Sequence, residues 1–115
     1  SMPAEVLSFG CRLNIVESAM MKELAAGQDN TIIINTCAVT SEAERQARQA
    51  VRKARRDHPS ARIVVTGCAA QLHPEVFAAM PEVSQVLGNP EKLLAESWQS
   101  NAPVLVQDIM AIRDT

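Results

Sequence analysis

The sequence has few glycines, few aromatic residues and no long apolar run. It contains no low-complexity tract or internal repeat, and its longest apolar stretches fall far short of the roughly 20 residues that cross a bilayer. No cleavable secretory signal pattern is present. With 115 residues, 47% of them hydrophobic, the chain is expected to form one compact, soluble domain without a membrane partner.

Cysteine is scarce as well. Three cysteines cannot all pair within one molecule, so we expect a reducing, cytoplasmic location and not a secreted disulfide scaffold. The lack of a C-x2-C pair argues against a thiol-redox protein, and it leaves a zinc site without its usual spacing. The lack of a G-x-G-x-x-G loop argues against a nucleotide-binding module, which stays open as an alternative in which the cysteines are incidental.

The net charge is small, at −2 from 11 basic and 13 acidic residues, and as a whole it does not suggest a nucleic-acid binder. The basic residues are clustered, however, with seven of the eleven between positions 45 and 62 and only Asp57 as an acid among them. Four of them recur at helical spacing, which fits either a solvated helix face or a strip that contacts RNA phosphates. These four candidate RNA-binding residues are Arg45, Arg48, Arg52 and Arg56.

Short β-branched or apolar runs alternate with helical patterns along the chain, and this alternation predicts repeated βαβ units. The predicted fold class is α/β, with an open, mostly parallel sheet of about five strands and helices on both faces, the doubly wound arrangement. The predicted strands are EVLSF (5–9), TIIIN (31–35), RIVVT (62–66), SQVL (84–87) and PVLV (103–106).

Four helices are predicted between these strands. A capping box of Ser41 and Glu44 begins the second helix, which ends at His58. Asn89 is the predicted cap of the fourth helix, and Pro90 would be its first residue. The first helix is expected over residues 14–26 with Asn14 as its cap, and the third over residues 74–80. The apolar faces are predicted to carry Val16, Met20 and Leu24 in the first helix, Ala43, Ala47, Ala50, Val51 and Ala54 in the second, and Leu93, Leu94 and Trp98 in the fourth.

Each of the three cysteines follows a predicted strand. Cys11 comes after VLSFG, Cys37 after IIINT and Cys68 after IVVTG. Because the carboxyl ends of parallel strands lie along one edge of a sheet, the three thiols are expected to converge there. Gly10 and Gly67 would allow the backbone to turn sharply and approach an inorganic group closely.

Three thiolates on one edge are compatible with more than one chemistry. A zinc ion would need a fourth ligand, for which His73 or His58 is available. A 4Fe-4S cluster usually takes four cysteines, so three would leave one iron open to a substrate or a sulfur. The remaining alternative is that the cysteines are buried side chains without a ligand.

The segments FGCRLNIVES and INTCAVTSEAERQARQAVRKARRDHPSARIVVTGCAAQ together resemble the N-terminal domain of the MiaB-like tRNA methylthiotransferases, which belong to the radical S-adenosylmethionine enzymes. The motifs are most similar to the branch that modifies threonylcarbamoyladenosine beside the tRNA anticodon. The resemblance implies that Cys11, Cys37 and Cys68 ligate an auxiliary 4Fe-4S cluster with one open iron. It also implies the tRNA anticodon arm as a partner.

The family pattern continues beyond this sequence. In the family a radical S-adenosylmethionine domain follows, with a C-x3-C-x2-C motif for a second 4Fe-4S cluster, and then an RNA-binding β-domain; neither motif nor domain is present here. The resemblance therefore implies a transferase as the parent chain, of which this domain would be inactive by itself. We expect residues 1–2 to be a tag remnant, 3–106 the domain and 107–115 the start of the connection to the other domains.

Polar residues near the cysteines are candidates to hydrogen-bond the cluster sulfurs or a substrate. Asn14 has a helix cap as its alternative role, and Asn35 a loop hydrogen bond. The full set of these neighbouring candidates is Asn14, Asn35, Thr36, Thr66 and Gln71.

Overall fold

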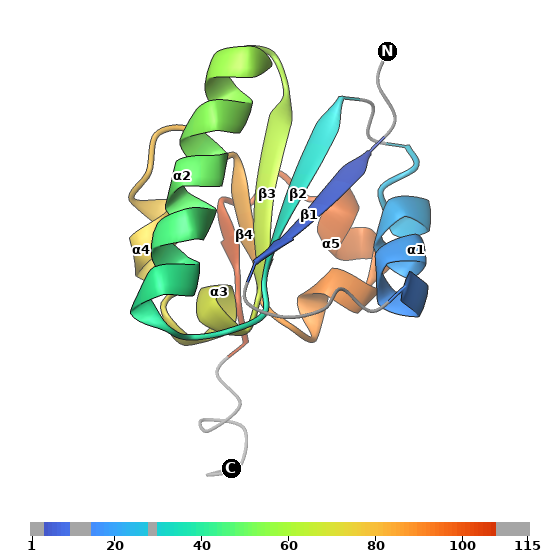
Figure 1. Ribbon diagram of the computed structural model, residues 1–115. Coiled ribbons are helices and arrows are strands. Elements are labelled where there is room, and N and C mark those ends of the chain that lie inside the picture. Colours follow the sequence, from blue (N-terminus) through green and yellow to red (C-terminus); the bar gives the residue numbers. More distant parts are fainter. Residues whose placement is uncertain (1–3, 10–14, 28–29, 108–115) are drawn as a thin grey trace, which may run out of the picture.

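The computed structural model describes residues 4–9, 15–27 and 30–107. Five parallel strands form one sheet in the order β1-β2-β3-β4-β5 (Figure 1). This arrangement confirms the predicted α/β class and the parallel sheet. The strands are β1 Glu5–Phe9, β2 Thr31–Thr36, β3 Arg62–Gly67, β4 Gln85–Leu87 and β5 Val104–Leu105.

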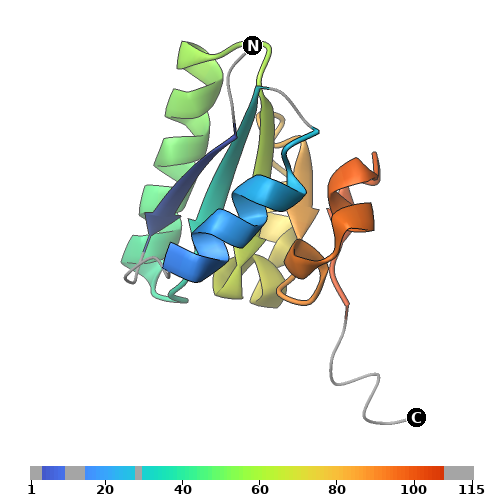
Figure 2. The same cartoon turned by 90° about the vertical axis from the view of Figure 1, so that its right-hand side faces the viewer.

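Helices cover both faces of the sheet, as Figure 2 shows with α1 in front of the strands and α2 behind them. None of the helices in the described part of the chain has the length and apolarity that a membrane span needs. The helices are α1 Ile15–Leu24, α2 Ser41–Asp57, α3 Cys68–Leu72, α4 Pro74–Ala78, the 3₁₀ helix η1 Glu91–Leu93 and α5 Ala95–Gln99.

The interior strand β2 is buried along its whole length because helices pack on both of its faces. Ile32 and Ile34 belong to the apolar cluster that contains α2, α3 and α4, whereas Ile33 belongs to the cluster with α1 and α5. The predicted alanine stripe of α2 is largely confirmed, since Ala43, Ala47, Val51 and Ala54 are buried and Ala50 is partly buried. Small side chains there allow the helix to lie close to the sheet.

Two pairs of neighbouring strands, β1 with β2 and β3 with β4, lead to opposite faces of the sheet, whereas β2 and β3 lead to the same face. The chain passes from β1 to α1 on one face and from β2 to α2 on the other, and β3 and β4 likewise precede α3 and η1 on opposite faces. In an open parallel sheet, such divergence creates a crevice at the carboxyl ends of the strands, where ligands commonly bind. The topology therefore favours a site at the carboxyl edge.

The predicted capping box of α2 is wrong. The N-cap is Thr40, whose Oγ1 accepts a hydrogen bond from the backbone N–H of Ala43 at 3.1 Å. Ser41 is already the first helical residue, and the Glu44 carboxylate contacts Nδ1 of His73 at 3.0 Å. Thr40 can accept a backbone N–H bond as well as Ser41 can, so the local motif does not decide which of them is the cap. Glu44 pairs with His73, which is far away in sequence, and not with the backbone at the start of the helix.

The predicted fourth helix is interrupted. Leu94 has an extended backbone (φ −107°, ψ 123°), which separates η1 from α5 and changes the direction in which the following side chains point. Leu93 and Leu94 are consequently exposed, contrary to the prediction, whereas Trp98 is buried as predicted. Asn89 is not the cap, because Pro90 occupies that position ahead of η1.

Two further predictions about helices need correction. Met20 of α1 is 43% exposed, and the buried face carries Met21 and Ala25, because α1 is turned by about one residue from the predicted orientation. The short helix α3, which begins at Cys68, was not predicted. Asn14 and the side chain of Val16 lie outside the described residues.

Candidate metal centre

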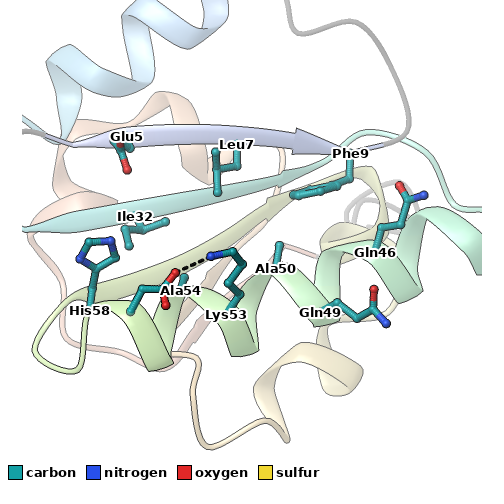
Figure 3. A pocket seen from close by; sticks show the side chains of 11 residues that line it. Glu5, Leu7, Phe9, Ile32, Gln46, Gln49, Ala50, Lys53, Ala54 and His58 are labelled. Carbon is teal, nitrogen blue, oxygen red and sulfur yellow. Dashed lines mark hydrogen bonds and ion pairs between the residues drawn. The ribbon is translucent and has the colours of Figure 1, made fainter.

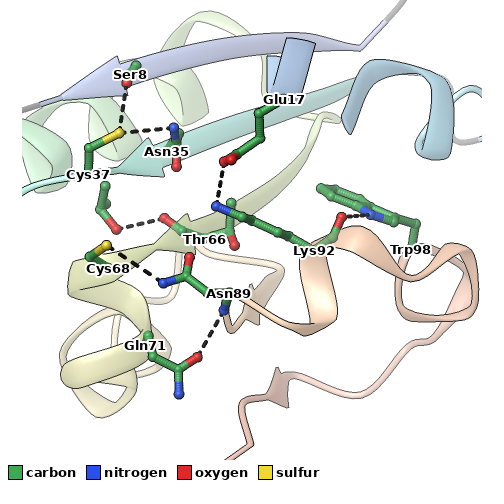
Figure 4. Close-up of polar contacts among 11 residues, drawn as sticks. Ser8, Glu17, Asn35, Cys37, Thr66, Cys68, Gln71, Asn89, Lys92 and Trp98 are labelled. Atoms are coloured by element: carbon green, nitrogen blue, oxygen red, sulfur yellow. Dashed lines mark hydrogen bonds and ion pairs between the residues drawn. The ribbon is translucent and has the colours of Figure 1, made fainter. Parts of the chain in front are cut away.

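The sheet places two of the three cysteines at the ends of neighbouring strands. Thr36 and Gly67 are partners in the register of β2 and β3, so Cys37 and Cys68 are the next residues on adjacent strands (Figure 4). The backbone N–H of Cys37 also donates to the carbonyl of Phe9 at the end of β1, at 3.0 Å. Cys11 lies outside the described residues, two positions after Phe9 in the sequence.

Cys37 is partly buried and has two polar side chains beside its sulfur. Asn35 Nδ2 donates to Cys37 Sγ at 3.1 Å, and Ser8 Oγ lies 3.3 Å from the same sulfur. Cys37 is disulfide-bonded in this structure, so Ser8 is the donor in the second contact. Since a metal-ligating cysteine must be a thiolate, metal binding at Cys37 would require the reduced protein.

Cys68 is an exposed free thiol at the start of α3. Asn89, two residues after β4, donates from Nδ2 to Cys68 Sγ at 3.6 Å. Each of the two described cysteines is therefore paired with one asparagine amide from the same edge of the sheet (Figure 4).

Gly67 lets the chain turn into α3 directly from the sheet. Its φ of +102° is a conformation that residues with a side chain rarely adopt. A Cβ at this position would lie 2.6 Å from the carbonyl oxygen of Thr36 and 2.7 Å from Oδ1 of Asn35. Glycine is therefore required for Cys68 to follow β3 so closely against the end of β2.

A row of polar side chains crosses the carboxyl edge on the face that α1 and α5 cover. Ser8, Asn35 and Thr66 are register partners on β1, β2 and β3, and Asn35 and Thr66 stand two residues beyond the buried Ile33 and Val64. Three buried oxygens at this edge have no hydrogen-bond partner in the described part of the chain: Asn35 Oδ1, Thr66 Oγ1 and Asn89 Oδ1. Unpartnered buried oxygens are typical of sites that receive a ligand or an ordered water.

The other predicted neighbours of the cysteines have structural contacts. Thr36 Oγ1 donates to the carbonyl of Thr66 at 2.6 Å and accepts from the N–H of Ala70 at 3.1 Å, which joins β2, β3 and α3. Gln71 accepts from the backbone N–H of Asn89 at 2.9 Å and donates to the carbonyl of Gln107 at 2.7 Å. Neither side chain has a contact with a described cysteine sulfur.

The sequence analysis missed Ser8, Asn89 and a partly buried ion pair. Lys92 of η1 is only 8% exposed, and its Nζ lies 2.5 Å from Oε1 of Glu17 on α1. Figure 4 shows this pair pointing toward the row formed by Asn35 and Thr66. The position of Asn89 just after a strand is a signal of the same kind as the positions of the cysteines, whereas the partners of Lys92 and Ser8 depend on the tertiary fold.

The donor set fits a cysteine-ligated cluster better than zinc. No group of three His, Cys, Asp or Glu side chains that could hold a metal occurs among residues 4–9, 15–27 and 30–107, a range that excludes Cys11. His73 is paired with Glu44, and His58 caps the end of α2, which is at the amino edge ahead of β3. Amide donors at two sulfurs suit metal-bound thiolates, among them the sulfur ligands of an iron-sulfur cluster.

The arginines of α2 differ in their surroundings. Arg45 forms an exposed ion pair with Glu42, and the hydrogen bond from Arg45 lowers the pKa of that carboxyl group. Arg48, Arg52 and Arg56 have no ion pair among the described residues. Two other members of the basic cluster have structural roles. Arg55 donates to the carbonyls of Pro59, Ala61 and Glu82, and Arg62 donates to those of Trp98 and Ser100.

A groove of about 420 Å³ separates the edge strand β1 from α2 (Figure 3). Leu7, Phe9, Ile32 and Ala50 form its apolar lining, and Lys53 is among its polar side chains. The groove contains neither of the described cysteines, so it is separate from the candidate metal centre.

Fold and site together define an α/β domain with two cysteines and several polar side chains at the carboxyl edge of a parallel sheet. Residues 4–88 match the sequence profile described as "Uncharacterized protein family UPF0004", and the chain belongs to this family. This match, with the relatives described next, confirms the resemblance to the N-terminal domain of the MiaB-like enzymes. No solved structure shows a significant match.

Curated relatives carry methylthiotransferase names. The chain is 48% identical over 114 residues to "Threonylcarbamoyladenosine tRNA methylthiotransferase MtaB" of Rickettsia prowazekii, covering 96% of this chain and 27% of the relative. It is 37% identical over 95 residues to the protein of the same name from Aquifex aeolicus, covering 74% and 23%. It is 35% identical over 101 residues to "Ribosomal protein uS12 methylthiotransferase RimO" of Sorangium cellulosum, covering 76% and 21%. The chain thus spans about a quarter of the length of these relatives.

Proposed function

We propose that this chain is the auxiliary 4Fe-4S domain of a tRNA methylthiotransferase that acts on threonylcarbamoyladenosine beside the anticodon. The observation that carries the proposal is the placement of Cys37 and Cys68 on neighbouring strand ends, each with an asparagine amide at its sulfur. Cys11 is the third proposed ligand. When bound, a cluster with three cysteine ligands would supply one open iron for a sulfur atom.

The polar residues of the edge have distinct tasks in this proposal. Asn35 donates to a ligand sulfur, and Thr66 contributes an unpartnered hydroxyl beside it. Thr36 and Gln71 support the site from behind by joining β2, α3 and the segment after β4. Asn14 stays a candidate from sequence alone.

The domain would work only within a longer chain. We assign residues 3–106 to the domain and 107–115 to the connection toward a radical S-adenosylmethionine domain. That domain would bind S-adenosylmethionine and a second 4Fe-4S cluster, and the whole protein would act in the cytoplasm. Val39 and Leu72 support a covering domain, because both are exposed apolar side chains that follow the carboxyl ends of β2 and β3. By itself the domain would transfer no methylthio group.

Anaerobic reconstitution of the reduced chain with iron and sulfide tests the metal centre. We expect about four irons and four sulfides per chain for the wild type, and loss of most of this iron in Cys37→Ala and Cys68→Ala. Each variant keeps only two thiolates for a cluster that usually takes four and is proposed to have three here. His73→Ala is the matched control and should keep the full complement. Iron and sulfide analysis with visible absorption gives the readout.

Two outcomes would refute the assignment. One is a full complement of iron in both cysteine variants, which would make the thiols packing residues. The other is stoichiometric zinc uptake that His73→Ala abolishes, which would favour a zinc module. Circular dichroism of each apo protein separates loss of ligands from loss of the fold.

We further propose that α2 contacts the tRNA backbone. Arg48, Arg52 and Arg56 lie at intervals of four residues and span about 12 Å along the helix. None of the three forms an ion pair with a described residue. Arg45 completes the set of four, although its ion pair with Glu42 must be broken or shared before it can bind a phosphate. Arginines arranged in this way bind phosphates without reading the base sequence.

Replacing Arg52 with glutamine should weaken binding to an anticodon stem-loop RNA and reduce the slope of log affinity against log salt concentration by about one. Lys22→Gln removes an exposed positive charge from α1, on the other face of the sheet, and should leave both quantities unchanged. Fluorescence anisotropy at several salt concentrations measures the effect. Equal losses in the two variants would show that only net charge matters and would contradict a binding strip on α2.

A further inference from the structure

Asn89 has an arrangement around it that matches the one around Asn35. Asn35 lies near the carboxyl end of β2 and Asn89 lies two residues after β4. Both direct Nδ2 to a cysteine sulfur, at 3.1 Å for Asn35 and 3.6 Å for Asn89 (Figure 4). Both also have an Oδ1 atom that is buried and lacks a hydrogen-bond partner in the described residues. Among the described residues, the hydrogen bond to sulfur is therefore the one polar contact of each side-chain amide.

This arrangement is costly for packing alone. A buried oxygen without a partner is destabilising, and each of the two asparagines has one. The orientation of each amide fits a sulfur that carries no proton, because a thiolate or metal-bound sulfur accepts the N–H, whereas the reverse orientation would set the amide oxygen against sulfur lone pairs.

Asn89 is held in position by its own backbone. Its N–H donates to Gln71 Oε1 at 2.9 Å, and Gln71 Nε2 in turn donates to the carbonyl of Gln107 at 2.7 Å. The backbone N–H of Gln107 in turn donates to Glu91 Oε1 at 3.3 Å, which adds a second hydrogen bond to this segment. The contacts of Gln71 therefore connect the segment that leaves β5 with the amide at Cys68.

We propose that Asn35 and Asn89 are a pair of positioning residues whose N–H···S hydrogen bonds raise the reduction potential of the cluster, and that Gln71 fixes Asn89 in place for this role. The inference rests on the proposed function. Reduction adds negative charge to a cluster and its ligand sulfurs, so an N–H donor stabilises the reduced form more than the oxidised form. Asn89 and Gln71 are not cluster ligands and act through Cys68.

The test is a redox titration of the reconstituted chain with dithionite, followed by electron paramagnetic resonance. Asn89→Leu removes the donor without adding charge, and Asn89→Asp also places a carboxylate near the sulfur, so both should shift the midpoint potential to more negative values, with the larger shift for aspartate. Gln71→Met should shift it in the same direction. Asn101→Asp is the matched control, because Asn101 is exposed and lies ahead of β5, at the opposite edge of the sheet. The midpoint potential of this variant should equal that of the wild type.

Iron and sulfide content separates the two levels of the inference. A wild-type chain that assembles no cluster contradicts the proposed function itself. Clusters of wild-type content and unchanged potential in Asn89→Leu and Asn89→Asp overturn the role of Asn89 alone. Loss of assembly in both Asn89 variants, with normal assembly in Asn101→Asp, also overturns it, since the amide would then be needed for building the site and not for its potential.

Discussion

Replacing Gly67 with alanine is expected to lower the free energy of unfolding by about 3–5 kcal/mol. The backbone there has a φ of +102°, and the new Cβ would lie 2.6 and 2.7 Å from the carbonyl oxygen and the nitrogen of Thr36. These are backbone atoms of a central strand, so they cannot move aside as the end of a flexible side chain can. Denaturant unfolding followed by circular dichroism measures the loss.

Gly27→Ala is the matched control for this prediction. A Cβ on Gly27 would meet nothing within 4 Å, and Gly27 is not among the glycines with positive φ in the described chain. We therefore expect a change between zero and a gain of about 1 kcal/mol in stability. Equal stabilities of the two alanine variants would show that the turn at Gly67 relaxes without cost. Gly67→Ala should also reduce iron uptake, because the turn positions Cys68 beside Cys37.

Replacing Trp98 with alanine should lower the free energy of unfolding by about 3–5 kcal/mol through the cavity that it leaves. Trp98 is fully buried in the apolar cluster under α1 and α5, where it packs with Met21, Ile33 and Val64. Its Nε1 also donates to the carbonyl of Lys92 at 2.9 Å. Because a domain of this kind is typically stable by about 5–15 kcal/mol, the loss would remove a large part of the total.

Trp98→Phe separates packing from the hydrogen bond. It keeps an aromatic ring but leaves the Lys92 carbonyl without this donor, so we expect a smaller loss of about 1–3 kcal/mol. Since Trp98 is the only tryptophan, unfolding must be followed by circular dichroism and not by fluorescence. A Trp98→Ala variant as stable as Trp98→Phe would mean that the cavity collapses and that the ring contributes little.

Much of the fold could be predicted from local sequence patterns. Runs such as TIIIN and RIVVT have three consecutive apolar residues because β2 and β3 are covered on both faces, and their alternation with helices predicts a parallel sheet. The same alternation predicts that Cys37 and Cys68 lie at one edge of the sheet, since the carboxyl ends of parallel strands share that edge. That their two strands are neighbours came from the structure. The meeting of all three cysteines stays a prediction, because Cys11 lies outside the described residues.

Helix ends and orientations could be predicted only in part. Thr40 and Ser41 are both residue types that cap helices, and the choice between them depends on where β2 ends and how the chain turns toward α2. Leu93 and Leu94 look like a buried pair in the sequence, yet the extended backbone of Leu94 exposes them. A local pattern contains the spacing of apolar residues but not the direction from which the neighbouring element packs.

By itself, the sequence determined the α/β class, the order of strands and helices along the chain, and the positions of the cysteines after strands. These features follow from periodicity and from residues that are close in sequence. Only the tertiary structure decided which polar groups surround the site. Lys92 meets Glu17 across 75 positions, Asn89 reaches Cys68 across 21, and Ser8 reaches Cys37 across 29. Such contacts form between side chains of different strands and helices, so their partners are set by the register of the sheet and by the face on which each helix packs.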